Sequence, residues 1–126
     1  MSKSCQKVVK MSKISESKLQ AECYQWFHNN YPNLRGLLCY NLNNSKNRID
    51  GNRNKALGLQ KGRSDMVIYL KGGKAVMIEM KSDTGEQSPA QIEWEKTITN
   101  AGYEYIVIRS FEQFKQTIIE LIQKQP

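Results

Sequence analysis

The sequence has few cysteines and no long apolar run, and each shortage excludes a class of protein. The three cysteines, Cys5, Cys23 and Cys39, form no Cys-x-x-Cys pair, so neither a disulfide-stapled secreted fold nor a zinc site is expected. The longest apolar stretch, Met66–Leu70, is far shorter than the ~20 residues that cross a bilayer. Residues 1–13 also lack the apolar segment of a secretory signal. We therefore expect an intracellular protein with no membrane partner.

Acidic residues are also scarce, because Asp and Glu together number 12 against 19 Lys and Arg. The net charge is therefore +7 and the pI about 9.4. Most of the excess lies in residues 1–13, with four lysines and no acid, and in residues 41–63, with six cations against Asp50 alone. The six are Lys46, Arg48, Arg53, Lys55, Lys61 and Arg63. Such a concentration is typical of nucleic-acid binding, although a soluble protein with charged loops has the same counts.

Length and composition indicate one soluble globular domain. The chain has 126 residues, of which 39% are apolar and 25% charged, as in an average domain with its own core. We expect residues 1–13 to form a flexible basic arm and residues 14–126 to form a single domain.

Helix and strand signals alternate along that domain. Serines that can cap a helix precede apolar residues at helical spacing three times, and the predicted helices follow Ser15, Ser88 and Ser110. Short apolar runs bounded by turn residues predict four strands, at 37–42, 65–70, 75–81 and 103–109. Residues 43–62, rich in Asn, Gly, Lys and Arg, are expected to form a long loop, which in a compact domain is usually functional or mobile.

The order of these elements, α-β-β-β-α-β-α, predicts the α/β class with a mixed β-sheet flanked by helices. Gly72-Gly73 separates the second and third strands and favours a tight hairpin. The third strand, the helix after Ser88 and the fourth strand form a βαβ unit, whose two strands we expect to be parallel.

Three charged residues lie at the ends of the two hairpin strands. Glu79 and Lys81 are two residues apart and therefore share one face of the strand at 75–81. Asp65 begins the partner strand, so the hairpin is expected to bring its carboxylate near Glu79. Two carboxylates beside an ammonium group suit a Mg²⁺ ion. An exposed Glu79–Lys81 ion pair, which would contribute little to stability, is the simpler alternative.

The sequence around these residues resembles the PD-(D/E)XK nuclease signature. Its two parts are Gly62-Arg63-Ser64-Asp65 and, after thirteen intervening residues, Ile78-Glu79-Met80-Lys81. Further matches narrow the resemblance to the VRR-NUC family over about residues 55–122; they are Gly58, Gly62, Ser88, Gln91, Trp94, Gly102 and a Val/Ile-rich strand. Ser64 stands where the motif has proline, which only shapes the turn before the strand. The resemblance implies a restriction-endonuclease-like fold, in agreement with the order of elements.

The resemblance also implies roles for the matching residues. Asp65, Glu79 and the main-chain carbonyl of Met80 would bind Mg²⁺, for which Mn²⁺ would substitute. Lys81 would position or activate the attacking water. Gln91 matches a glutamine beside the family's site, but its spacing from the capping serine is equally that of a helix capping box. Both roles of this glutamine stay open.

Relatives also carry an acid on the first helix, where this sequence offers Glu16 and Glu22. On a helical wheel Glu16 falls within the apolar face and Glu22 toward its edge. Because a buried carboxylate is costly unless it is paired or metal-bound, we favour Glu16, which also matches the family's Glu-x-x-x-Gln with Gln20. A structural role in the first helical turn is the alternative for Glu16.

Together these patterns predict a Mg²⁺-dependent endonuclease that hydrolyses DNA, with the six cations of residues 41–63 holding the phosphate backbone. Stand-alone members of the family resemble phage-encoded, dimeric junction resolvases. We therefore expect a homodimer in the cytoplasm of a host cell, acting on branched DNA such as four-way junctions. The alternatives are a non-catalytic nucleic-acid-binding domain and a small interaction module with no nucleic-acid role.

Overall fold

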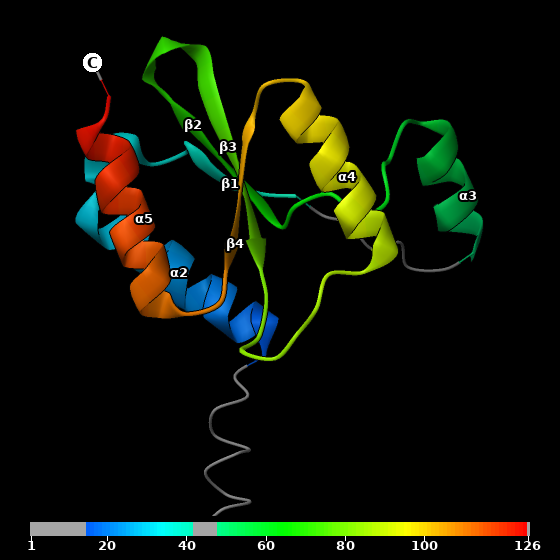
Figure 1. Ribbon diagram of the computed structural model, residues 1–126, viewed down its shortest axis with the longest axis horizontal. Helices are drawn as coiled ribbons and strands as arrows, with labels where there is room; N and C mark the ends of the chain where they lie inside the picture. The colour runs from blue at the N-terminus through cyan, green and yellow to red at the C-terminus, as the bar shows by residue number, and fades with distance from the viewer. Residues whose placement is uncertain (1–14, 42–47, 126) are drawn as a thin grey trace, which may run out of the picture.

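The computed structural model describes residues 15–41 and 48–125. A four-stranded sheet stands between helices, with α2 and α5 on one face and α4 on the other (Figure 1). The helices are α2 (Glu16–Asn30), α3 (Arg48–Ala56), α4 (Pro89–Asn100) and α5 (Phe111–Gln123). The strands are β1 (Leu38–Tyr40), β2 (Met66–Leu70), β3 (Lys74–Met80) and β4 (Glu104–Ile108). The predicted arm at residues 1–13 lies outside the described residues.

The sheet is mixed, as predicted. Its strand order is β1-β2-β3-β4. β1 pairs with β2 and β2 with β3 in antiparallel fashion, whereas β3 and β4 run parallel. The parallel pair is joined through α4, so the expected βαβ unit is confirmed. The α/β class and the restriction-endonuclease-like arrangement of a mixed sheet flanked by helices are confirmed with it.

Alternation along the strands divides the apolar side chains between two cores. The larger core joins the sheet to α2 and α5, and its fully buried members include Phe27, Ile68, Val76, Ile78 and Phe114. The smaller core joins the sheet to α4, through Val67, Ala75, Met77, Trp94 and Ile98. Because odd-numbered residues of β2 and β3 face α4, the charged residues at the strand ends fall on that side.

The serine caps predicted for three helices are confirmed. The Ser15 hydroxyl accepts from the Lys18 N–H at 3.2 Å, and the Ser110 hydroxyl accepts from the Gln113 N–H at 3.1 Å. Each bond satisfies a donor that the first helical turn leaves without a partner. The start of each helix is therefore set locally by its cap.

The prediction of an unbroken loop at residues 43–62 is wrong, because residues 48–56 form α3. This helix carries Ile49 as its one large apolar residue among polar ones. It therefore has no apolar repeat, the main signal by which a helix is recognised in a sequence.

Cys23 is a packing residue of the larger core. Its side chain is fully buried, and burial, reinforced by the charge of Glu22, raises the pKa of its thiol to about 12. The thiol therefore stays protonated at neutral pH.

None of the helices in the described ranges is long and apolar enough to cross a membrane.

Candidate active site

Asp65 and Glu79 lie opposite each other where the β2–β3 hairpin ends. Met66 pairs with Ile78, and continuing this antiparallel register by one residue brings Asp65 level with Glu79. Asp65 also accepts a hydrogen bond through Oδ2 from the Met80 N–H, at 2.6 Å. The prediction that the hairpin brings the two acids together is confirmed.

The turn before Asp65 is held by hydrogen bonds in place of the missing proline. Ser64 is fully buried, and its hydroxyl donates to the Met66 carbonyl at 3.0 Å. The Asn41 side chain donates to the Ser64 carbonyl at 3.2 Å, and the Asn41 N–H donates to the Asp65 carbonyl at 2.8 Å. These bonds orient the backbone that carries the Asp65 carboxylate.

Glu79 is a fully buried carboxylate with one satisfied oxygen. Its Oε1 accepts from the Tyr105 hydroxyl and from Gln87 Nε2, the latter at 3.1 Å. Gln87 Nε2 also donates to Glu95 at 2.9 Å. The other oxygen, Oε2, is buried and has no hydrogen-bond partner among the described residues. A buried carboxylate oxygen without a partner lowers the stability of the fold. A bound cation or a hydrogen-bond donor at Oε2 would remove this cost.

Gln87 and Tyr105 are site residues that the sequence analysis missed. Tyr105 pairs with Met77 across β3 and β4, and its ring contacts Trp94 of α4 at 5.9 Å between centroids. Burial and then the hydrogen bond to Glu79 raise the pKa of Tyr105, which keeps its hydroxyl protonated and donating. The one signal in the sequence was a tyrosine on the same sheet face as Glu79.

Lys81 ends the same strand face and is almost completely buried, at 7% exposure. Its N–H donates to the Ile108 carbonyl at 2.9 Å, and Arg109 fastens the following loop by donating to the carbonyls of Ser82 and Gly85 at 2.9 and 2.7 Å. The alternative of an exposed Glu79–Lys81 ion pair is wrong, because both side chains are buried.

Opposing charges act on Asp65, and the net effect is a raised pKa. Burial is the largest cause, and the Met80 N–H bond opposes it. The charges of Glu79 and Glu16 raise the pKa further, whereas the charge of Lys81 lowers it. The acidic side chains therefore concentrate negative charge around Asp65 that Lys81 offsets only in part, an arrangement that favours a bound cation.

The helical wheel predicted that Glu16 lies on the buried face of its helix, and this prediction is wrong. Glu16 lies at the rim of the site. It is exposed, because it is the first residue of α2 and precedes the packed part of that helix, which begins at Leu19. Its carboxylate nevertheless acts on Asp65 and lies near Gly85. Glu22 is also exposed and is absent from the lining of the site's cavity.

A cavity of about 1090 Å³ opens in front of Asp65. Its lining residues come from α2, α3, the α3–β2 segment and the start of α4; they include Glu16, Asn52, Lys55, Lys61, Arg63, Asp65, Ser88 and Gln91. Gln91 forms the capping box, accepting from the Ser88 N–H at 2.8 Å while its own N–H donates to the Ser88 hydroxyl at 3.2 Å. The capping box uses the side-chain oxygen of Gln91 and not its NH₂ group. Gln91 therefore caps α4 and also lines the cavity.

The six predicted phosphate-binding cations differ in their position relative to the cavity. Lys55, Lys61 and Arg63 line the cavity, whereas Arg53 lies on α3 outside that lining. Arg48 begins α3. Lys46 lies outside the described residues. At least half of the predicted basic set therefore shares a cavity with Asp65.

Gly62 is required where the basic segment meets α4. Its φ is +76°, and a Cβ atom there would lie 2.3 Å from the Ala90 carbonyl oxygen. We expect Gly62→Ala to lower the free energy of unfolding by about 1–3 kcal/mol more than Gly58→Ala. Gly58 is the matched control, because its φ is +102° with nothing within 4 Å of an added Cβ. Equal losses in urea unfolding would show that the close approach is unimportant.

The residues present fit a divalent cation that keeps part of its water. No three His, Cys, Asp or Glu side chains within residues 15–41 and 48–125 form a complete metal cage. Mg²⁺, however, commonly takes one or two carboxylates and retains several waters. Asp65 and Glu79 supply two carboxylates, and the unpartnered Oε2 of Glu79 is a free acceptor.

Comparison with known proteins gives a family from the sequence and a shared fold from solved structures. Residues 9–112 match the sequence profile of the VRR-NUC domain. A solved structure described as a VRR_NUC domain protein has a TM-score of 0.75 at 19% identity, covering 89% of this chain and 91% of that chain. A second, described as a VRR_NUC domain, has a TM-score of 0.53 at 19% identity, covering 79% and 92%. No curated protein matches the chain.

Proposed function

The chain belongs to the VRR-NUC domain family, which implies nuclease activity, and we propose that it is a Mg²⁺-dependent endonuclease that hydrolyses phosphodiester bonds in DNA. The observation that carries the proposal is the unpartnered Oε2 of Glu79, buried opposite Asp65. A basic cavity next to two such acids suits a polyanionic substrate. We place the enzyme inside a cell, in the cytoplasm of the host if a phage encodes it, where DNA is accessible to it.

Asp65, Glu79 and the Met80 carbonyl hold the metal ion in this proposal, and Mn²⁺ replaces Mg²⁺. When bound, the ion supplies a water of lowered pKa and neutralises charge that builds on the phosphate. Tyr105 and Gln87 hold Oε1 of Glu79, which leaves Oε2 to face the ion. Glu16 adds negative charge from the rim.

Lys81 positions the attacking water and stabilises the developing charge on the phosphate. Most of its side chain is buried, and within the described part of the chain no carboxylate forms a salt bridge with it. A lysine charge that no carboxylate pairs with remains available to a neighbouring anion, and a largely buried stem holds it in place.

Tyr105→Phe tests the support of Glu79. The variant loses the hydroxyl that donates to Oε1 but keeps the ring contact with Trp94. We expect cleavage to fall about 10- to 100-fold, the usual effect of removing a partner of a metal ligand. Tyr103→Phe, on an exposed tyrosine near the start of β4, is the control and should cleave normally. Equal rates for the two variants would contradict the role.

The cations of the cavity wall are proposed to hold the DNA backbone. Replacing both Lys55 and Lys61 with alanine should weaken binding to all sequences about equally. The slope of log affinity against log salt should become shallower by about 0.9 for each lost phosphate contact on duplex DNA. Lys71→Ala, in the hairpin turn at the other end of β2, should leave the slope unchanged. An unchanged slope in the double variant would show that the lysines are only solvated.

We further propose that the active unit is a homodimer that prefers branched DNA, such as a four-way junction. One site cuts one strand, and a junction presents two equivalent strands related by a two-fold axis. A two-fold dimer, the commonest oligomer, has the same symmetry. Sedimentation with and without junction DNA should show the dimer, and a monomer in both states would contradict it.

The decisive experiment is cleavage of labelled duplex, flap and four-way-junction DNA with Mg²⁺, with Mn²⁺ and with EDTA. Metal-dependent cleavage supports the proposal, and the ranking of substrates tests the preference for branches. Salt-sensitive binding without cleavage in any metal would instead support the non-catalytic nucleic-acid-binding alternative. An RNA duplex of the same sequence tests the preference for DNA.

A further inference from the structure

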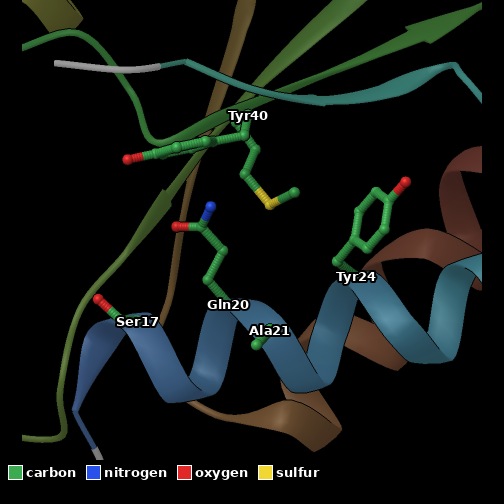
Figure 2. A pocket seen from close by; sticks show the side chains of 6 residues that line it. Ser17, Gln20, Ala21, Tyr24 and Tyr40 are labelled. Carbon is green, nitrogen blue, oxygen red and sulfur yellow. The ribbon is translucent and has the colours of Figure 1, made fainter.

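A second cavity lies on the opposite face of the sheet, between α2 and the edge strand β1 (Figure 2). Its volume is about 410 Å³. We call it the tyrosine pocket, and its lining residues are Ser17, Gln20, Ala21, Tyr24, Tyr40 and Met66. Gln20 belongs to the Glu-x-x-x-Gln match with Glu16, and the other five have no role in the proposed catalytic site.

Two exposed aromatic rings border the tyrosine pocket. Tyr40 of β1 is 60% exposed and Tyr24 of α2 is 41% exposed. The Tyr24 ring is stacked on His28 one turn along α2, at 6.0 Å between centroids. Exposed, oriented aromatic rings are the usual platforms on which unpaired nucleobases stack.

Gln20 lies between the two tyrosines along the pocket. Figure 2 shows its amide group extending from α2 toward Tyr40, with the Ala21 methyl group beside it. A glutamine amide both donates and accepts hydrogen bonds, as the edge of a nucleobase does. The pocket therefore combines flat apolar surfaces with one amide group at its centre.

The tyrosine pocket and the active-site cavity approach each other at two places. Glu16 and Asp65 line the active-site cavity, and the next residue of each, Ser17 and Met66, lines the tyrosine pocket. Consecutive Cα atoms are only about 3.8 Å apart. In addition, the residue after Tyr40 donates its N–H to the Asp65 carbonyl. Because Asp65 and Met66 point to opposite faces of the sheet, a strand whose phosphate lies at Asp65 brings a neighbouring nucleotide to the pocket by passing round the end of the sheet where α2 begins, at Glu16 and Ser17.

We propose that the tyrosine pocket binds one unpaired nucleobase of the DNA substrate, next to the phosphate that is cut. This inference rests on the proposed function and narrows its substrate class to branched DNA that carries an unpaired nucleotide beside a duplex at the branch. The base stacks on Tyr40 and its edge hydrogen-bonds to Gln20. A base within a duplex is already stacked on both sides and does not enter.

The chemistry of the lining favours a base over other ligands. No lysine or arginine lines the pocket, so it offers a phosphate group no cationic partner. No acidic residue lines it either, so it offers a metal ion no carboxylate. A flat, uncharged ring with polar edges matches two tyrosines, a glutamine and a serine.

The test uses the full chain in EDTA, so that binding is measured without cleavage. The probe is a duplex with one unpaired 2-aminopurine, whose fluorescence is quenched on stacking, compared with the same duplex fully paired. We expect Tyr40→Ala to bind the unpaired probe about 5- to 100-fold more weakly and to lose the quenching. Binding of the paired duplex should not change.

Two variants serve as matched controls. Tyr40→Phe keeps the ring and should keep the quenching. Tyr69→Ala removes another exposed tyrosine, 49% exposed, from the α4 face of the sheet and should behave as wild type. Thermal unfolding of each variant verifies that it is folded.

Quenching and affinity in Tyr40→Ala equal to wild type would overturn the inference. A shift from dimer to monomer in Tyr40→Ala with unchanged base binding would also overturn it, because the pocket would then hold a second copy of the chain. The proposed function fails separately, if Mg²⁺ supports no cleavage of any DNA. Loss of quenching in Tyr40→Ala without any cleavage would sustain base binding by the pocket alone.

Discussion

Glu79→Gln is expected to reduce Mg²⁺-dependent cleavage by about 10³-fold or more while leaving the fold intact. The glutamine has the same shape, and its oxygen can still accept from Tyr105 and Gln87, which bond Glu79 in the structure. The change removes the charge of the buried carboxylate and places an NH₂ group where the unpartnered Oε2 lies. An NH₂ group cannot bind a cation, so the loss falls on metal binding.

The measurement is single-turnover cleavage of a labelled substrate at saturating protein. Glu104→Gln is the matched control, because it makes the same change on a solvent-exposed acid of β4, which pairs with Lys74 at 3.6 Å. The control should cleave as wild type does. Cleavage by Glu79→Gln within tenfold of the wild-type rate would remove Glu79 from the proposed catalytic site. Thermal unfolding without metal should show that Glu79→Gln is no less stable.

The parts of the site that depend on local pairing were predictable from the sequence. A tight turn at Gly72-Gly73 fixes the register of the β2–β3 hairpin, and both glycines adopt positive φ. That register alone places Asp65 opposite Glu79. The helix caps at Ser15 and Ser88 each join a serine hydroxyl to a backbone N–H only three residues away. Such short-range geometry follows from spacing.

The parts that depend on tertiary packing were not predictable. Gln87 reaches Glu79 because Arg109 ties the loop after β3 to the end of β4. Tyr105 reaches Glu79 because β4 pairs in parallel with β3 after the crossover through α4. The burial of Lys81, likewise, comes from elements distant in sequence. Periodicity within one segment carries no information about these contacts.

Asp65→Asn is expected to have opposite effects on cleavage and on stability. Asparagine keeps an oxygen for the Met80 N–H but loses the charge, so cleavage should fall by about 10³-fold or more. Stability without metal should rise. Burial, together with the charges of Glu79 and Glu16, raises the pKa of Asp65 over the opposing effects of the Met80 N–H and Lys81. An ionised Asp65 therefore destabilises the folded chain.

The gain in stability from Asp65→Asn should depend on pH with a definite sign. Because folding raises the pKa of Asp65, the folded chain holds that proton more tightly than the unfolded chain does. The wild type therefore loses stability as pH rises from the ordinary Asp pKa of about 3.9 through the raised value, and the loss stays constant above it. Asp65→Asn should thus gain little at low pH and most at neutral pH. Asp83→Asn, on an exposed acid of the loop after β3, is the control.

Mg²⁺ should reverse the order of stability of wild type and Asp65→Asn. An ion that binds only the folded chain stabilises it in proportion to the logarithm of its concentration above Kd. Wild type, which keeps both carboxylates, should gain stability as Mg²⁺ is added, whereas Asp65→Asn should gain almost none. Urea unfolding gives the free energy of unfolding of both proteins at acidic and neutral pH, each with Mg²⁺ and with EDTA. If Asp65→Asn is less stable than wild type at neutral pH in EDTA, Asp65 is a structural residue and its proposed place at the metal is wrong.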